Sequence, residues 1–168
     1  MFTAMATLPL HIPRPELEWR PLREGDLAHV AALEAQIHAA PWTIGNFRDA
    51  VAAGYSTRVG ERESRIVAYG VLMLSPGEAQ ILNLSVVPDA RREGIGRRLL
   101  QRFVEDARRL HAGQIFLEVR PSNAAAIRLY ESEGFVLVAR RAAYYPGITI
   151  ESAREDALVM RLPLDVLR

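Results

Sequence analysis

Two periods of apolar residues run along this chain, and each predicts a type of secondary structure. Near the start, apolar side chains recur at helical intervals of three and four, at Leu27, Val30, Leu33 and Ile37. This spacing predicts a helix that Asp26 caps and that ends before Pro41. A second, shorter helix is expected after Thr43, with Gly54 at its end.

Strand patterns surround and follow these helices. Leu17 to Arg23 predicts a first strand, and 56–61 and 66–74 predict a hairpin around a polar turn. The next strand begins at Ile81 and ends at Pro88. Its side chains are expected to alternate, with one face formed by Leu82, Leu84 and Val86 and the other by Asn83, Ser85 and Val87.

The order strand, glycine turn, helix, strand, helix between residues 81 and 135 predicts a parallel strand pair with a helical crossover. The crossover helix is amphipathic and extends to about His111, and a strand is expected at 115–120. Ser122 is the expected cap of the following helix, which Gly134 ends. Strands at 135–139 and 157–162 would close the sheet around a long loop, residues 140–156.

Composition narrows the class of protein. The chain has 168 residues, a net charge of +1 and no cysteine, which excludes disulfides, thiolate metal sites and a cysteine nucleophile. No apolar run is long enough to span a bilayer, and residues 1–15 do not have the pattern of a signal peptide. We expect a flexible extension at 1–16, one domain at 17–168, and a cytoplasmic location without a nucleic-acid or membrane partner.

The strongest chemical signal is a glycine turn, Arg91-Arg92-Glu93-Gly94-Ile95-Gly96-Arg97, between a strand and a helix. Glycines allow a ligand to approach the backbone closely, and the first N–H groups of a helix attract anions. A diphosphate would fit, although a tight turn without a ligand would use the same glycines. A Rossmann turn would need a third glycine where Leu99 stands, and a Walker motif would need a lysine, which the chain does not contain.

The turn resembles the Arg-x-x-Gly-x-Gly pyrophosphate loop of the GNAT acetyltransferases. The flanking sequences are similar too: Leu84-Ser85-Val86-Val87-Pro88, Asn123 and Leu129-Tyr130-Glu131-Ser132-Glu133-Gly134-Phe135. Further similarity, to the RimI-type enzymes that acetylate the N-terminal alanine of a small-subunit ribosomal protein, lies in Pro41-Trp42, Leu117-Glu118-Val119-Arg120, Ser122-Asn123-Ala124-Ala125-Ala126, Tyr144-Tyr145-Pro146 and Glu155-Asp156-Ala157.

This resemblance implies an α/β (α+β) GNAT fold, a mixed and mostly antiparallel sheet whose central strands splay apart around acetyl-CoA. It implies cofactor contacts from Leu84, Ser85, Val86, Arg92, Glu93, Gly94, Ile95, Gly96, Arg97 and Asn123. No metal is expected, and a monomer is the expected oligomeric state. Two features depart from the pattern: Pro121 replaces a common alanine and removes a backbone donor, and the loop at 147–154 is long.

The resemblance also implies a pair of catalytic residues. Glu118 alternates out of phase with Ile115, Leu117 and Val119, so it could face a cleft and accept the amine proton through water. Spacing alone would favour a surface glutamate on a half-exposed strand, and the resemblance reverses that preference. Tyr130 could protonate the departing thiolate, or it could pack in the core.

Other candidates are weaker. Tyr144 and Tyr145 could line an acceptor pocket or close the core. The histidines, His11, His29, His38 and His111, have no spacing typical of a metal site, so we interpret them as structural or surface residues.

Three functions are consistent with these residues. The first is N-terminal acetylation of a ribosomal protein by direct attack in a ternary complex, since no cysteine can carry the acetyl group. The second is acetylation of lysine side chains or small amines. The third is an inactive CoA-binding module, against which the presence of both Glu118 and Tyr130 argues.

Overall fold

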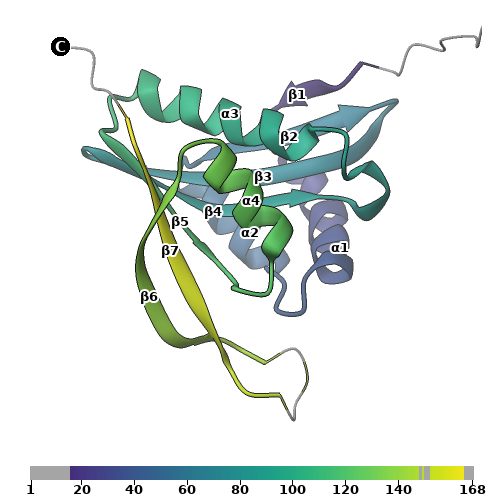
Figure 1. The fold of residues 1–168 in the computed structure, drawn as a ribbon. Helices are drawn as coiled ribbons and strands as arrows, with labels where there is room; N and C mark the ends of the chain where they lie inside the picture. Colours follow the sequence, from purple (N-terminus) through teal and green to yellow (C-terminus); the bar gives the residue numbers. More distant parts are fainter. Residues whose placement is uncertain (1–15, 148, 150–151, 165–168) are drawn as a thin grey trace, which may run out of the picture.

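A mixed sheet runs through the computed structural model, which describes residues 16–147, 149 and 152–164 (Figure 1). The order of its seven described strands is β1-β2-β3-β4-β5-β7-β6. The strands are β1 (Glu18–Arg20), β2 (Ser56–Arg62), β3 (Arg65–Ser75), β4 (Glu78–Val86), β5 (Gln114–Val119), β6 (Val136–Tyr145) and β7 (Glu155–Pro163). Each pair is antiparallel except β4 with β5, so the predicted mixed, mostly antiparallel sheet is confirmed.

Helices cover both faces of this sheet. Figure 1 shows α3 (Ile95–Arg109) and α4 (Ala124–Ser132) on the near face, with α1 (Leu27–Ile37) and α2 (Ile44–Ala52) behind it. Two short 3₁₀ turns, η1 (Glu24–Asp26) and η2 (Pro88–Ala90), precede α1 and α3. None of the helices in the described ranges is long and apolar enough to cross a membrane.

Each face of the sheet has its own apolar core. The apolar stripe of α3 is buried against one face, where Leu99, Leu100 and Phe103 have no exposed surface. The other core joins α1 and α2 to β2 and β3, and its largest fully buried members are Phe47 and Tyr69. Burial of these stripes provides the main stabilisation of the layers.

The expected helix caps are confirmed only in part. Asp26 occupies the N-cap position of α1, as predicted, but its side chain makes no capping hydrogen bond, because its carboxylate accepts hydrogen bonds from the Arg23 N–H and the Arg20 guanidinium. Ser122 does not cap α4. The side chain of Asn123 accepts the Ala126 N–H instead, at 3.2 Å. Thr43 does cap α2, since its hydroxyl accepts the Asn46 N–H.

Three strands, β4, β6 and β7, also differ from their predicted patterns. The closing strands are longer than expected, so Tyr144 and Tyr145 end β6 and do not lie in a loop. A register irregularity between Arg141 and Tyr145, with Ala143 at φ 49°, obscures the alternation there. In β4, a bulge at Leu82 turns this side chain toward the α1–α2 core, away from the face of Leu84.

The predicted N-terminal extension falls almost entirely on residues 1–15, which lie outside the described residues. The division into an extension and one domain therefore stays a prediction.

Gly70 in β3 allows α3 to approach the sheet closely. A Cβ atom at this position would lie 2.7 Å from the Asn83 carbonyl oxygen and 2.9 Å from the Phe103 ring. We predict that Gly70→Ala lowers the free energy of unfolding by about 1–3 kcal/mol, the usual cost of overpacking. Urea unfolding would measure it.

Gly25→Ala is the matched control, because a Cβ there meets nothing within 4 Å. The control should change the free energy of unfolding by less than about 1 kcal/mol. Equal unfolding midpoints for the two variants would contradict the packing argument.

Candidate active site

The central strands separate halfway along their length. β4 and β5 pair only from Glu78↔Gln114 to Ile81↔Leu117, whereas β4 stays paired with β3 as far as Val86. Beyond Ile81, the edge of β4 that faces β5 therefore has backbone groups without a strand partner. Such groups need hydrogen-bonding partners, and a ligand in the gap between the strands could supply them.

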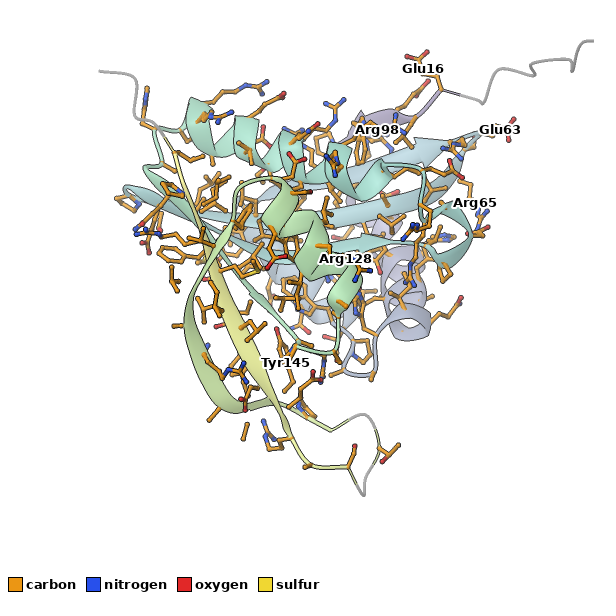
Figure 2. The ribbon with its side chains drawn as sticks, in the orientation of Figure 1. Glu16, Glu63, Arg65, Arg98, Arg128 and Tyr145 are labelled. Carbon is orange, nitrogen blue, oxygen red and sulfur yellow. The ribbon has the colours of Figure 1, made fainter. Side chains whose placement is uncertain are left out.

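A groove of about 610 Å³ opens on the α3–α4 side of this gap. Its lining comes from β4, from the glycine turn and from α4, and includes Leu84, Ser85, Val86, Arg92, Gly94, Ile95, Gly96, Arg97, Asn123 and Arg128. Figure 2 shows Arg128 on α4. The groove thus gathers nine of the ten expected cofactor residues at one site.

The glycine turn has the geometry of an anion-binding helix start. Gly94 is the N-cap of α3 at φ +75°, a conformation that favours glycine. Gly96 follows in the first turn, and a Cβ there would be in ordinary contact with Val86 and Leu129. The free N–H groups of α3 and its dipole favour a negatively charged ligand at this end of the helix.

The charged side chains of the glycine turn point in different directions and have different partners. Arg97 contacts α4, donating to the Ser132 hydroxyl at 3.1 Å and pairing with Glu133 at 3.0 Å. Glu93 is the expected cofactor residue that does not line the groove, because its carboxylate pairs with Arg62 at 2.8 Å. Any contribution of Glu93 to ligand binding would come from its backbone.

A smaller cavity of about 200 Å³ lies at the other end of the gap. Glu118, Tyr130 and Tyr145 contribute to its walls, together with residues of α1 and β4. The lining residues that it shares with the groove are His38, Leu84, Ser85 and Asn123. The two spaces therefore adjoin, so that a long ligand in the groove could present one end to a second ligand in the cavity.

Glu118 projects from β5 on the face opposite Leu117 and Val119, as its alternation predicts. Its side chain is 16% exposed, and Oε1 accepts a hydrogen bond from Arg141 Nη1 at 2.5 Å. Arg141 comes from β6, reaches across β7, and also covers the Tyr144 ring at 4.0 Å. The candidate base is therefore ion-paired with an exposed guanidinium in this structure.

Tyr130 is a buried residue of α4, only 7% exposed, and its ring packs against Phe135 at a centroid distance of 5.8 Å. Burial, followed by the nearby Tyr145, raises the pKa of its phenol to about 12. Tyr130 thus remains protonated at neutral pH. It is also a weaker acid than an ordinary tyrosine, whose pKa is about 10.

The end of β6 forms part of the cavity wall through its tyrosines. Figure 2 shows Tyr145 below the first turn of α4, and Arg120 lies over its ring at 4.3 Å. Burial, and then the charge of Glu118, raises the pKa of Tyr145 to about 12. Of the two roles considered for this tyrosine, the structure therefore supports the one at the pocket.

Glu155, at the start of β7, connects this wall to the start of α4. It accepts hydrogen bonds from the N–H and hydroxyl of Ser122 at 2.7 and 3.0 Å and from Arg120 at 3.1 Å. Burial by itself would raise the pKa of Glu155, but these hydrogen bonds lower it below its usual value. The same contacts explain why Ser122 is not the helix cap.

Sequence reasoning missed a buried carboxylate in the cavity wall. Glu34 of α1 is 2% exposed and accepts hydrogen bonds from the Tyr69 hydroxyl at 2.7 Å and the Asn83 amide at 3.0 Å. One turn later, His38 lines both the cavity and the groove, although it was expected to be structural or on the surface. The missed signal was a glutamate on the apolar face of the first helix.

The described residues contain no group of three or more acidic, histidine or cysteine side chains that could hold a metal ion.

Comparison with known proteins agrees with this arrangement. Residues 16–135 match the model of the Acetyltransferase (GNAT) family. The [ribosomal protein bS18]-alanine N-acetyltransferase of Escherichia coli K12 is 34% identical, over 86% of this chain and 96% of its own length. The N-alpha-acetyltransferase RimI of Mycobacterium tuberculosis is 37% identical, over 81% of this chain and 90% of its own.

A solved structure extends the likeness to three dimensions. The crystal structure of the ribosomal-protein-S18-alanine N-acetyltransferase from Escherichia coli superposes with a TM-score of 0.80, covering 88% of this chain and 94% of that one. The splayed strands, the glycine turn and this similarity over most of the chain have one explanation. The chain belongs to the GNAT acetyltransferase family and is an acetyl-CoA-dependent N-acetyltransferase.

Proposed function

We propose that this enzyme acetylates the α-amine of a protein N-terminus, and that its substrate is a small-subunit ribosomal protein beginning with alanine. The observation that carries the proposal is the cavity that contains Glu118 and Tyr130 and adjoins the cofactor groove. The Escherichia coli relative, which is named for alanine N-acetylation of ribosomal protein bS18, supports the choice of substrate.

Acetyl-CoA would lie along the groove with its diphosphate at the start of α3. The N–H groups after Gly94, together with Arg92 and Arg97, would hold the phosphates. The free edge of β4 at Leu84 to Val86 would bind the pantetheine amides, with Asn123 on the other side of the groove. This placement would leave the thioester at the junction with the cavity.

The amine would attack the thioester carbonyl directly, because the chain has no cysteine to carry an acetyl group. Glu118 would accept a proton from the amine through water, after the incoming cation replaces Arg141 at the carboxylate. Tyr130 would donate to the departing sulfur. Because its pKa of about 12 lies above that of a thiol, it would act first as a hydrogen-bond donor and transfer its proton as the C–S bond breaks.

Amine chemistry favours an α-amine over a lysine side chain. An α-amine titrates near ~7.7–8.0 and a lysine near ~10.4, so at neutral pH roughly a tenth of α-amines but less than a thousandth of lysines are neutral. A carboxylate is a weak base and suits the easier of the two deprotonations. A cytoplasmic location and a monomeric state remain predictions beside this proposal.

The groove gives the first test. Gly96→Val would place two methyl groups beyond a Cβ that already contacts Leu129 at 3.5 Å and Val86 at 3.6 Å. We predict at least ~10-fold weaker acetyl-CoA binding, or ~1.4 kcal/mol, measured by calorimetric titration.

Gly96→Ala is the control, and its affinity for acetyl-CoA should be much closer to that of the wild type. Gly94 is a poorer choice, since its φ of +75° would add backbone strain to any substitution. Wild-type affinity in a folded Gly96→Val protein would exclude the turn from the cofactor site.

The second test concerns the two catalytic candidates. Glu118→Gln and Tyr130→Phe should each lower kcat by roughly 10²-fold or more, the usual range for general acid–base groups, with acetyl-CoA affinity little changed. Steady-state assays of CoA release measure kcat.

Glu131→Gln, on the exposed side of α4, and Tyr55→Phe, in the other core, are matched controls that should keep wild-type kcat. If either active-site variant turned over at the wild-type rate with saturating substrates, that residue would lose its assigned role.

The third test concerns the acceptor. Peptides that begin with Ala should be acetylated, whereas the same peptides with a blocked N-terminus and an internal lysine should not, with products measured by mass spectrometry. The cavity of about 200 Å³ should also slow peptides with a bulky first residue. Efficient acetylation of the blocked peptide would refute the α-amine assignment. Equal rates for Ala and bulky starts would refute only the preference for a small residue.

A further inference from the structure

His38 is a titratable side chain that lines the cavity together with Glu118 and has no role in the steps described above. His38 directly follows α1, and its Nε2 lies 2.8 Å from the Ser85 hydroxyl and 3.5 Å from Glu34 Oε2. Nδ1, the other ring nitrogen, makes no hydrogen bond with any residue that the structure describes. The imidazole is 38% exposed at the junction of the cavity and the groove.

Glu34 contacts this imidazole from within the core. In addition to Tyr69 and Asn83, the Trp42 N–H donates to Glu34 at 3.3 Å. A buried carboxylate with several donors has little freedom to move. A fixed carboxylate beside an imidazole is the arrangement by which a histidine base is held in one orientation.

The charged and titratable groups around His38 come from several elements. Glu34 (α1) and Tyr69 (β3) lie behind the ring. The cavity in front of it is lined by Glu118 (β5), Arg120 (directly after β5), Tyr130 (α4) and Tyr145 (β6). Arg120 is paired with Glu155 at 3.1 Å, and Glu118 with Arg141. Among the described residues, Glu34 is therefore the acidic neighbour of the imidazole that has no arginine partner of its own.

The acetylation of an amine requires two protons to leave nitrogen. An ammonium group carries three protons and the product amide carries one, while sulfur takes up a single proton. Glu118 can accept the first proton, when the ammonium becomes a nucleophile. The second proton leaves as the C–N bond forms, next to the sulfur and thus near the junction where His38 lies.

We propose that His38 accepts this second proton and that Glu34 is its positioning residue, an inference that rests on the proposed acetylation of an amine. The nitrogen lone pair forms the C–N bond, and the C–S bond breaks with its electron pair on sulfur. The second N–H proton passes to Nδ1 of His38, and the Tyr130 hydroxyl protonates sulfur. The imidazolium then returns a proton to Tyr130 through water.

His38→Ala tests the proposal, assayed with whichever primary amine the enzyme accepts, since the proton count holds for all of them. We expect kcat to fall at least ~10-fold while acetyl-CoA affinity is kept. Added imidazole should restore most of the lost rate, because the cavity is open and imidazole can replace the missing base. A residue with only a structural role would not be rescued in this way.

His29→Ala is the matched control, since His29 lies on α1, the helix that His38 directly follows, and is exposed. It should keep wild-type kcat and should not respond to imidazole. Glu34→Gln should lower kcat, and added imidazole should not restore the activity of this variant, because the imidazole ring of His38 is still present. Circular dichroism would verify that the Glu34→Gln variant is folded. If that variant does not fold, the result with His38→Ala alone decides the role of His38.

The outcomes separate the two proposals. Wild-type kcat in His38→Ala, or a loss that imidazole does not restore, would overturn the role of His38 and leave N-terminal acetylation intact. Rescue by imidazole with lysine or a small amine as the accepted substrate would support His38 and refute the α-amine assignment.

Discussion

The separation of β4 from β5 is the constraint on which the rest of the site depends. Their pairing ends at Ile81↔Leu117, although both strands continue. The bulge at Leu82 lies at the same point and changes the direction of the chain. The proposed chemistry depends on this gap, because the gap exposes backbone groups that a cofactor could bind. It also leaves Glu118 facing a cavity, beside the tyrosines of α4 and β6.

The sequence predicted those parts of the fold that depend on local periodicity. The stripe of α3, the hairpin of β2 and β3, and the glycine turn all depend on neighbours within a few residues, so their patterns are visible in the chain. The end of β6 could not be predicted in this way. Its irregularity near Ala143 breaks the alternation, and only pairing with β7, as at Tyr145↔Glu155, defines the strand.

The same distinction applies to the site. The alternation of β5 placed Glu118 correctly on the cavity face, and its proposed role came from the resemblance to known acetyltransferases. Glu34 and His38 were missed, because their importance comes from partners 35 to 51 residues away, including Tyr69, Asn83 and Ser85. A carboxylate on an apolar helix face was the available clue. The hydrogen-bond donors that offset the cost of burying this carboxylate could be identified only in three dimensions.

The contacts of Glu155 link the two halves of the site. This carboxylate holds Ser122, which precedes the Asn123 cap at the groove, and Arg120, which covers the Tyr145 ring in the cavity. The groove and the cavity are therefore connected by contacts that neither ligand needs to touch. If acetyl-CoA strengthens these contacts and improves the affinity for the acceptor, thermodynamic linkage requires the acceptor to improve the affinity for acetyl-CoA by the same factor. Because the coupling is the same in either order, the order in which the two substrates bind would depend on their binding rates alone.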